Sequence, residues 1–425
     1  MKIDPENVWS DIQAIKKSSP LVHHTINQKE VWIGWLSSLV EAYNMAIYSF
    51  VAPLIAPLLF QDQAAWSAIF FSYFLIFIGS CLMYPAGAIY YGLIGDQVGR
   101  QKICVYSTLG LAITTGLMGL MPIHLFENAW IYFLILIGAQ HFFSGGEYHG
   151  SIVFSLEHSE QKQNGLTSSL SCLFAVFGLV LANGLATLSL VMQDEFWVRV
   201  CFIFGGIGGI ISYFLKAHCQ ETPDFCALNR ELLKSVKLAN FIKEEWLKIV
   251  KVIFVLAFFI VSYSFIFIFL PLVNSDTNVQ DFSTFKSLIA YGFFLVLSGL
   301  LADRIGIQKT ILMGLCLFSI VIVPLTFLCK KLLLLQIALT PCACLVIGPI
   351  HSWILHQFAV SQRCRGIFMS SAIATSIFGG STVPICLMIF EKHQSLVICS
   401  LYPLMIALIS FGVLTLVPQP KKVSI

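Results

Sequence analysis

Long apolar runs, separated by short polar or glycine-containing turns, follow one another along almost the whole chain from Trp32 to Val417. A helix needs roughly 20 apolar residues to cross a hydrocarbon core of about 30 Å, and the runs have this length. The pattern therefore predicts twelve transmembrane helices. Their expected spans are residues 31–58, 65–91, 103–123, 130–156, 166–190, 197–216, 249–273, 283–302, 309–328, 331–356, 366–390 and 395–417.

The polar segments divide these spans into two groups of six. We predict an all-α membrane protein with one six-helix bundle over residues 31–216 and a second over 249–417, joined by a cytoplasmic linker at 217–248. Residues 1–30 and 418–425 are expected to be cytoplasmic tails. The N-terminal tail lacks the basic, apolar and small-residue order of a cleaved signal peptide.

Composition agrees with a membrane protein. Hydrophobic residues make up 57% of the chain and charged residues 11%, whereas soluble domains carry about 25% charged residues. The net charge of +3 comes from basic residues at helix ends, so no nucleic-acid partner is expected. The 13 cysteines are scattered through apolar runs, and we interpret them as packing residues, not as disulfides or metal ligands.

The basic residues also predict an orientation. If both termini are cytoplasmic, 20 of the 25 Lys and Arg residues fall on the cytoplasmic side, as the positive-inside rule requires. We therefore expect a multi-pass protein of a bacterial inner membrane, in contact with the lipid bilayer and acting as a monomer.

One short motif occurs twice, at the ends of the second and the eighth predicted helix. The copies are 207 residues apart, about half the chain. Each predicts a tight glycine turn that presents an aspartate to the positive end of a neighbouring helix. The residues are Gly92, Asp96, Gly99 and Arg100 in the first copy, and Gly299, Asp303, Arg304 and Gly306 in the second.

Repeated halves are typical of transporters that hold a solute near the midplane between them. We expect Asp96 to face the start of the eleventh helix near Gly366, and Asp303 to face the start of the fifth near Gly165. Arg100 is expected to join the charge network of Asp96. Together the two copies would latch one of two conformations.

These motifs, with three other segments, resemble the metabolite:proton symporter branch of the major facilitator superfamily, which includes proline/betaine transporters. The segments are residues 41–45, 140–150 with its Gly-Gly-Glu at 145–147, and the Glu-Thr-Pro at 221–223. The resemblance implies two rocking six-helix bundles and transport of a small metabolite, with no enzymatic activity.

The chain departs from the pattern of this branch at several positions. Asn44 stands where the branch usually has aspartate, Tyr84 and Ile137 where it has arginine, and His356 where it has glutamate. Proton coupling through the usual network of the branch is therefore left open. The predicted C-terminal tail also lacks the coiled-coil extension of osmosensing relatives.

Two carboxyl groups are the candidates for ion coupling. Of the 22 acidic residues, only Glu41 and Glu147 fall at membrane depth, and no Lys or Arg is expected to share that depth. Ionisable groups inside a bilayer are costly and mark functional sites. We predict that Glu41 and Glu147 exchange a proton, or alternatively sodium, as the coupling ion, without any other cofactor. Alternatively, Glu147 anchors close helix packing beside Gly145 and Gly146.

Polar and aromatic side chains near these carboxyl groups are the candidates for binding a small-molecule substrate. They are Glu41, Tyr43, Asn44, Tyr48, Gln140, Ser144, Tyr263 and Trp353. Because no cation is expected at their depth, we predict import of a neutral or zwitterionic metabolite such as an amino acid, proline or a betaine. Two alternatives stay open, an efflux antiporter for drugs or metabolites and a non-transporting receptor built on a transporter fold.

Overall fold

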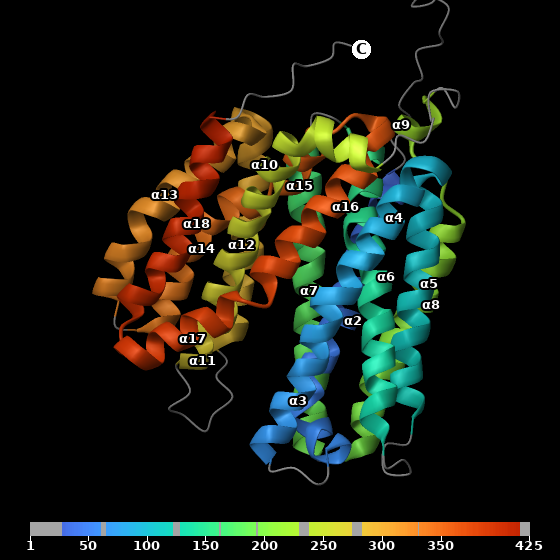
Figure 1. Cartoon of the computed structure of the whole chain (residues 1–425), viewed down its shortest axis with the longest axis vertical. Coiled ribbons are helices and arrows are strands. Elements are labelled where there is room, and N and C mark those ends of the chain that lie inside the picture. Colours follow the sequence, from blue (N-terminus) through green and yellow to red (C-terminus); the bar gives the residue numbers. More distant parts are fainter. Residues whose placement is uncertain are drawn as a thin grey trace, which may run out of the picture.

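The computed structural model describes residues 28–60, 65–121, 128–160, 163–192, 194–228, 238–273, 283–329 and 331–416 (Figure 1). The predicted tails, apart from residues 28–30, and residues 229–237 of the predicted linker lie outside the described residues. Over the described part, twelve helices are long and apolar enough to cross a membrane. The predicted helix count and the all-α membrane fold are confirmed.

The first half of the molecule consists of the helices that precede residue 218. They are α2 (Gln28–Leu59), α3 (Ala65–Ile78), α4 (Tyr84–Val98), α5 (Arg100–Leu120), α6 (Ala129–His158), α7 (Asn164–Met192) and α8 (Glu195–Ala217). The π-helical turn η1 (Gly79–Met83) joins α3 to α4, so these form one span. The short helix α9 (Pro223–Cys226) follows this half.

The second half contains the remaining spans. They are formed by α10 (Leu238–Ser264), α11 (Leu270–Val273), α12 (Ser283–Ile305), α13 (Ile307–Leu328), α14 (Leu332–Ile347), α15 (Ile350–Leu355), α16 (Arg363–Ala374), α17 (Thr382–His393) and α18 (Leu396–Leu416). Three of these spans are interrupted. The π-helical turns η5 (Phe265–Phe269) and η7 (Thr375–Gly379) follow α10 and α16, and α14 breaks before α15 at Gly348 and Pro349.

Helix α10 begins earlier than predicted, at Leu238 and not at residue 249. Phe241 is fully buried in its first turns, whereas Lys243 and Glu244 are exposed. An amphipathic turn of this kind is stable at the edge of a bundle. The apolar-run criterion missed it because too few of its residues are hydrophobic.

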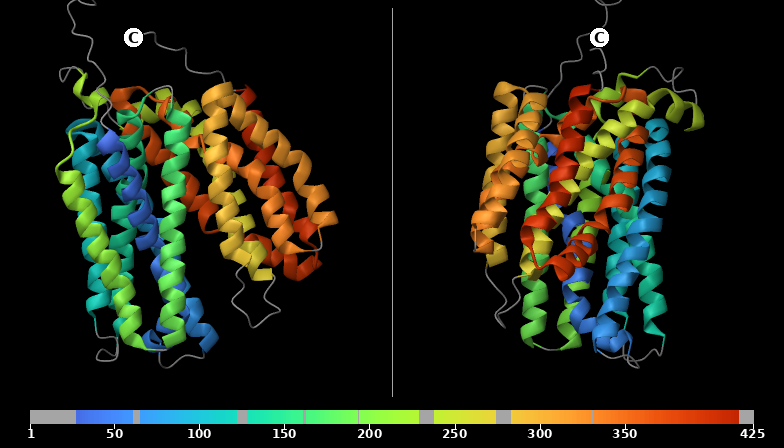
Figure 2. Two further views of the ribbon diagram at one scale, coloured as in Figure 1. Left: turned by 180° about the vertical axis from the view of Figure 1, so that it is seen from behind. Right: turned by 60° about the vertical axis from the view of Figure 1, so that its left-hand side comes forward.

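The two halves lie side by side and approach each other most closely at the end that carries α9, here named the α9 end (Figures 1 and 2). Toward the opposite end the two bundles lean apart in both figures. Two helix pairs dominate the contact between halves, α4 with α16 and α7 with α12. Each pair combines the span that ends in one copy of the repeated motif with a span of the other half, so the motif lies where the halves meet.

Candidate functional site

Glu147 lies on α6 in the centre of the first half and is almost fully buried. It forms an ion pair with Lys216 of α8. Four hydroxyl groups also donate to its carboxylate, from Ser37 (3.0 Å), Ser107 (2.9 Å), Thr108 (2.6 Å) and Ser151 (3.0 Å). The hydroxyl donors come from α2, α5 and α6 and the lysine from α8, so Glu147 joins four helices.

The prediction that no basic residue shares the depth of the two glutamates is wrong. Lys216 is the last residue of the predicted span 197–216 and was counted with the cytoplasmic charges, but α8 continues to Ala217 and Lys216 is 1% exposed. Its ammonium group also donates to Thr108 and Ser151, at 2.8 Å each. The sequence held one sign that this face of α8 is polar: Ser212 lies one helical turn before Lys216. In the structure, the Ser212 hydroxyl lies 2.9 Å from that of Ser37.

Glu41 on α2 is also buried, at 6% exposure, but its surroundings differ. Its carboxylate accepts a hydrogen bond from Ser144 of α6 at 2.6 Å. No ion pair of Glu41 occurs among the described residues. The structure thus brings Glu41 and Ser144 together as the sequence suggested, and it separates the two carboxyl groups into one with a lysine partner and one without.

The other predicted ligands on α2 point into the packing of the first half. The Tyr43 hydroxyl donates to the carbonyl of Cys201 at 2.8 Å, and the Tyr48 ring packs 5.9 Å from that of Phe133. The Asn44 side chain is fully buried, and the amide of Gln140 donates to its backbone carbonyl at 3.0 Å. The predicted polar face of α2 therefore splits between α6 and α8.

In the second half, Tyr263 and Trp353 lie apart from this group. The Tyr263 ring packs at a tilt against that of Tyr291, with ring centroids 6.2 Å apart. Trp353 lies beneath the ammonium group of Lys251, 5.8 Å from its ring centroid. Lys251 is 1% exposed, so it is a second lysine, near the start of the predicted span 249–273, that was counted with the cytoplasmic charges and that α10 buries.

Tyr148 and His351 form a contact that sequence reasoning missed as a pair. Tyr148 on α6 and His351 on α15 come from opposite halves, and the hydroxyl lies 3.4 Å from Nε2 of the imidazole. The ring of His149 is 5.7 Å from that of His351. Residues 203 positions apart show no local pattern that would have revealed this contact.

The two motif aspartates make equivalent contacts. Asp96 accepts hydrogen bonds from the backbone N–H groups of Cys364 (3.0 Å) and Arg365 (3.1 Å) at the start of α16. Asp303 accepts from Gly165 (2.8 Å) and Leu166 (2.9 Å) at the start of α7. In each case the carboxylate caps the second and third residues of a helix of the other half, where N–H groups are unpaired.

These contacts lie where the sequence predicted them, within a few residues of Gly366 and at Gly165. The motif glycines that precede the next helix, Gly99 and Gly306, have φ values of 111° and 102°. Only glycine adopts such a conformation at little cost. The role of these residues as a latch stays a prediction.

Around the first copy, charged side chains extend the contact between halves. Arg100 is fully buried and pairs with Glu157 at 3.4 Å and with Asp96 at 3.9 Å. Arg363 of α16 pairs with the same Glu157 at 2.6 Å and with Asp224 of α9 at 2.8 Å. These side chains connect α5, α6 and α9 to the second half.

Around the second copy the surroundings are simpler. Arg304 and Gly306 are exposed, and a Cβ atom at Gly306 would have open space around it. No ion pair of Arg304 occurs in the described part of the chain. The two copies therefore share the helix cap and differ in charge pairing.

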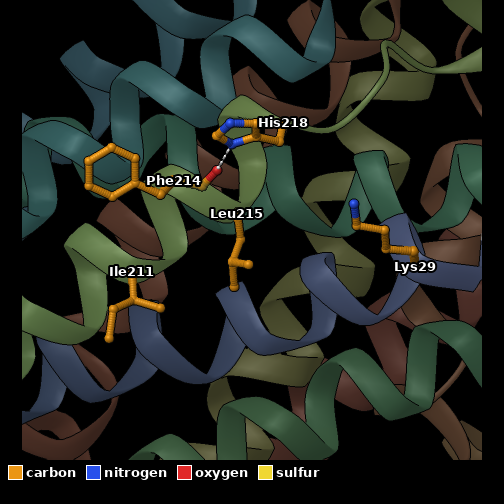
Figure 3. Close-up of a pocket in the computed structure, with 5 residues that line it drawn as sticks. All are labelled: Lys29, Ile211, Phe214, Leu215 and His218. Carbon is orange, nitrogen blue, oxygen red and sulfur yellow. Dashed lines mark hydrogen bonds between the residues drawn. The ribbon is translucent and has the colours of Figure 1, made fainter.

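Two surface pockets lie away from all of these groups. One has a volume of about 490 Å³ and lies between α2 and α8, lined by Lys29, Ile211, Phe214, Leu215 and His218 (Figure 3). The other, of about 370 Å³, lies between α5 and α8 and is lined by apolar residues and glycines. Both face outward from the first half, so neither is assigned to a solute.

Residues 34–328 match the sequence model of the Major Facilitator Superfamily. The chain is 27% identical to a proline/betaine transporter of Salmonella typhimurium, over 69% of this chain and 63% of that protein. It is 25% identical to the proline/betaine transporter of Escherichia coli, over 90% and 81%. A glycine betaine/proline/ectoine/pipecolic acid transporter of Dickeya dadantii is also 25% identical, over 91% and 82%.

Solved structures of two sugar symporters share the fold. The proton:xylose symporter XylE superposes with a TM-score of 0.75 at 15% identity, covering 93% of this chain and 96% of that one. The fucose:proton symporter of E. coli gives a TM-score of 0.65 at 12% identity, covering 91% and 98%. At these identities the likeness shows the fold alone.

Proposed function

The chain belongs to the Major Facilitator Superfamily and is a membrane transporter, not an enzyme, and from this premise we propose that it imports a small neutral or zwitterionic metabolite together with a proton. The two halves would expose the solute to each side of the membrane in turn. An amino acid, proline or a betaine is the proposed solute class, because the similar transporters are named for these compounds.

The observation that carries the proposal is the contrast between Glu41 and Glu147. The charge of Glu147 is balanced by Lys216. Protonation of Glu147 would leave the buried Lys216 charge without its partner. Glu41 is bonded to the Ser144 hydroxyl and can change its protonation state without breaking an ion pair. We therefore assign proton exchange to Glu41. A coupling role for Glu147 stays a prediction, and its ion pair favours the alternative of a structural anchor.

The buried cations support the solute class for a reason that differs from the one drawn from the sequence. Basic residues are present in the interior, but Arg100, Lys216 and Arg363 already hold carboxylates of the protein, and Lys251 lies over the Trp353 ring. A dicarboxylate would have to compete with these pairs. A solute without net charge would not.

For the arrangement in the cell, we propose a bacterial inner membrane with both termini in the cytoplasm, since the basic residues favour this orientation. The α9 end would then face the cytoplasm, and the described conformation would be closed on that side by the motif contacts. We propose that the protein works as a monomer with a small-molecule substrate, without nucleic acid or an organic cofactor. Sodium is the alternative coupling ion.

The proposal is tested with purified protein in liposomes. An inside-alkaline pH gradient is imposed, and uptake of radiolabelled proline and glycine betaine is followed with and without a protonophore. We expect accumulation that the protonophore abolishes. Accumulation that requires a sodium gradient would replace the proton by sodium.

Two other outcomes would overturn the proposal. Loss of preloaded solute in exchange for external protons, under the same inside-alkaline gradient, would favour the efflux antiporter. Absence of any solute flux, together with binding of a partner protein to the α9 end, would favour the receptor.

A further inference from the structure

The contact between Tyr148 and His351 joins the two halves through side chains alone. Tyr148 is half-buried and His351 is 3% exposed. Their separation of 3.4 Å between hydroxyl and Nε2 is at the long limit of a hydrogen bond. A contact of this length contributes little to closure of the halves, and a ligand with better geometry can replace it.

The neighbourhood of this pair is aromatic. Phe259 and Tyr263 are four residues apart on α10, so they share one helix face, and both are half-buried. The Phe259 ring lies 6.3 Å from that of His351, and Tyr263 lies one helical turn further along the same face of α10. Aromatic faces attract alkylammonium groups.

Three buried cations elsewhere, Lys216, Arg100 and Arg363, are engaged by protein carboxylates, and a fourth, Lys251, lies over the Trp353 ring. Glu147 holds Lys216, and Glu157 holds both Arg100 and Arg363. Tyr148 and His351 carry no such partner, and no ion pair of His351 occurs in the described ranges. A hydroxyl and an imidazole N–H can both donate to one carboxylate when His351 is protonated at Nε2.

We propose that Tyr148 and His351 bind the carboxylate of a zwitterionic solute between the two halves, with the rings of Phe259 and Tyr263 at its cationic end. The bound carboxylate replaces the direct contact between hydroxyl and imidazole, so the solute itself links α6 to α15. This assignment rests on the proposed function and specifies how the solute class is recognised.

The experiment compares binding of two probes by purified protein. Glycine betaine carries a trimethylammonium group and a carboxylate, whereas choline carries the same cation and a hydroxyl group. Binding is measured as the ligand-induced rise in melting temperature over a concentration series. We expect glycine betaine to stabilise the wild-type protein and choline to stabilise it much less.

Tyr148→Phe and His351→Gln should each weaken binding of glycine betaine by about tenfold or more, because each removes or alters a hydrogen bond to a charged group. Their ligand-free melting temperatures should stay near that of the wild type. The matched controls are Tyr132→Phe, whose hydroxyl bonds the Leu117 carbonyl far from this site, and His356→Gln, whose ring bonds the Ser352 carbonyl. Both should bind glycine betaine as the wild type does.

The outcomes separate this assignment from the proposed function. If the wild type binds glycine betaine and both variants bind it equally well, the assignment is overturned while the function stands. Equal binding of choline and glycine betaine would also overturn it. If the wild type binds neither glycine betaine nor proline, measured in the same way, the proposed solute class is wrong, and the assignment fails with it. Should Tyr148→Phe fail to fold, His351→Gln decides alone.

Discussion

The Glu147 site and the Glu41 site lie in the same half of the molecule, and in the sequence both are single carboxyl groups inside apolar helices. In the structure, Glu147 has a lysine and four hydroxyl groups around it, whereas Glu41 has the Ser144 hydroxyl. A fully paired carboxylate fixes helix positions, and one without a charged partner is free to exchange a proton. Burial of an ionisable group therefore identifies a candidate, and its partners decide its role.

The largest expected effect is on the paired site. Glu147→Gln leaves the Lys216 charge buried without its partner, which should destabilise the protein by about 3–5 kcal/mol. The measurement is the melting temperature in detergent, with Glu41→Gln as the matched variant and little change expected for it.

A double variant separates the effect of an unpaired buried charge from the effect of changing the side chain at position 147. Glu147→Gln combined with Lys216→Met removes both charges, so most of the lost stability should return. If Glu147→Gln alone melts at the wild-type temperature, Glu147 is not the structural anchor described here.

The α9 end offers the same contrast between paired and unpaired charges. Arg363→Gln removes the link from the second half to Glu157 and Asp224, which should weaken the closed arrangement by about 1.5–3 kcal/mol. Arg304→Gln, at an exposed position of the second copy, should change nothing. The measurement is the distance distribution between spin labels placed on α5 and α16.

Of the two arginine substitutions, only Arg363→Gln is expected to give a longer and broader distance distribution. Equal effects of the two substitutions would mean that charge pairing does not distinguish the two copies. No effect of either would mean that the aspartate caps alone hold the halves together.

The smallest expected effect comes from single hydroxyl groups. Ser144→Ala removes the hydrogen bond of Glu41, and Ser151→Ala removes one of several at Glu147, so each should cost about 1 kcal/mol or less of stability. Only Ser144→Ala should alter the dependence of uptake on the pH gradient. Altered coupling in Ser151→Ala would assign proton exchange to Glu147 as well.

Much of the fold was predictable from the sequence because its signals are local. Apolar runs predicted the spans, and the glycine-aspartate-glycine repeat predicted which helix ends Asp96 and Asp303 would meet. Both signals depend on chemistry that the bilayer and the helix terminus impose on nearby residues.

The site was less predictable because it depends on where a helix ends and which face it turns inward. Lys216 is the last residue of its predicted span, and only its ion pair with Glu147 of α6 shows that it lies inside the bundle. Tyr43 and Tyr48 share α2 with Glu41, but packing against α6 and α8 directs them elsewhere. The contact of Tyr148 with His351 requires both halves in place.

The central claim, that Glu41 carries the coupled proton, is tested most directly by Glu41→Gln in liposomes. Two activities are compared for glycine betaine, accumulation driven by a pH gradient and counterflow exchange without a gradient. Glu391→Gln, at an exposed position, is the control. We predict that Glu41→Gln retains counterflow but no longer accumulates solute above the external concentration, while Glu391→Gln does both. Gradient-driven accumulation by Glu41→Gln at the wild-type level would contradict the account.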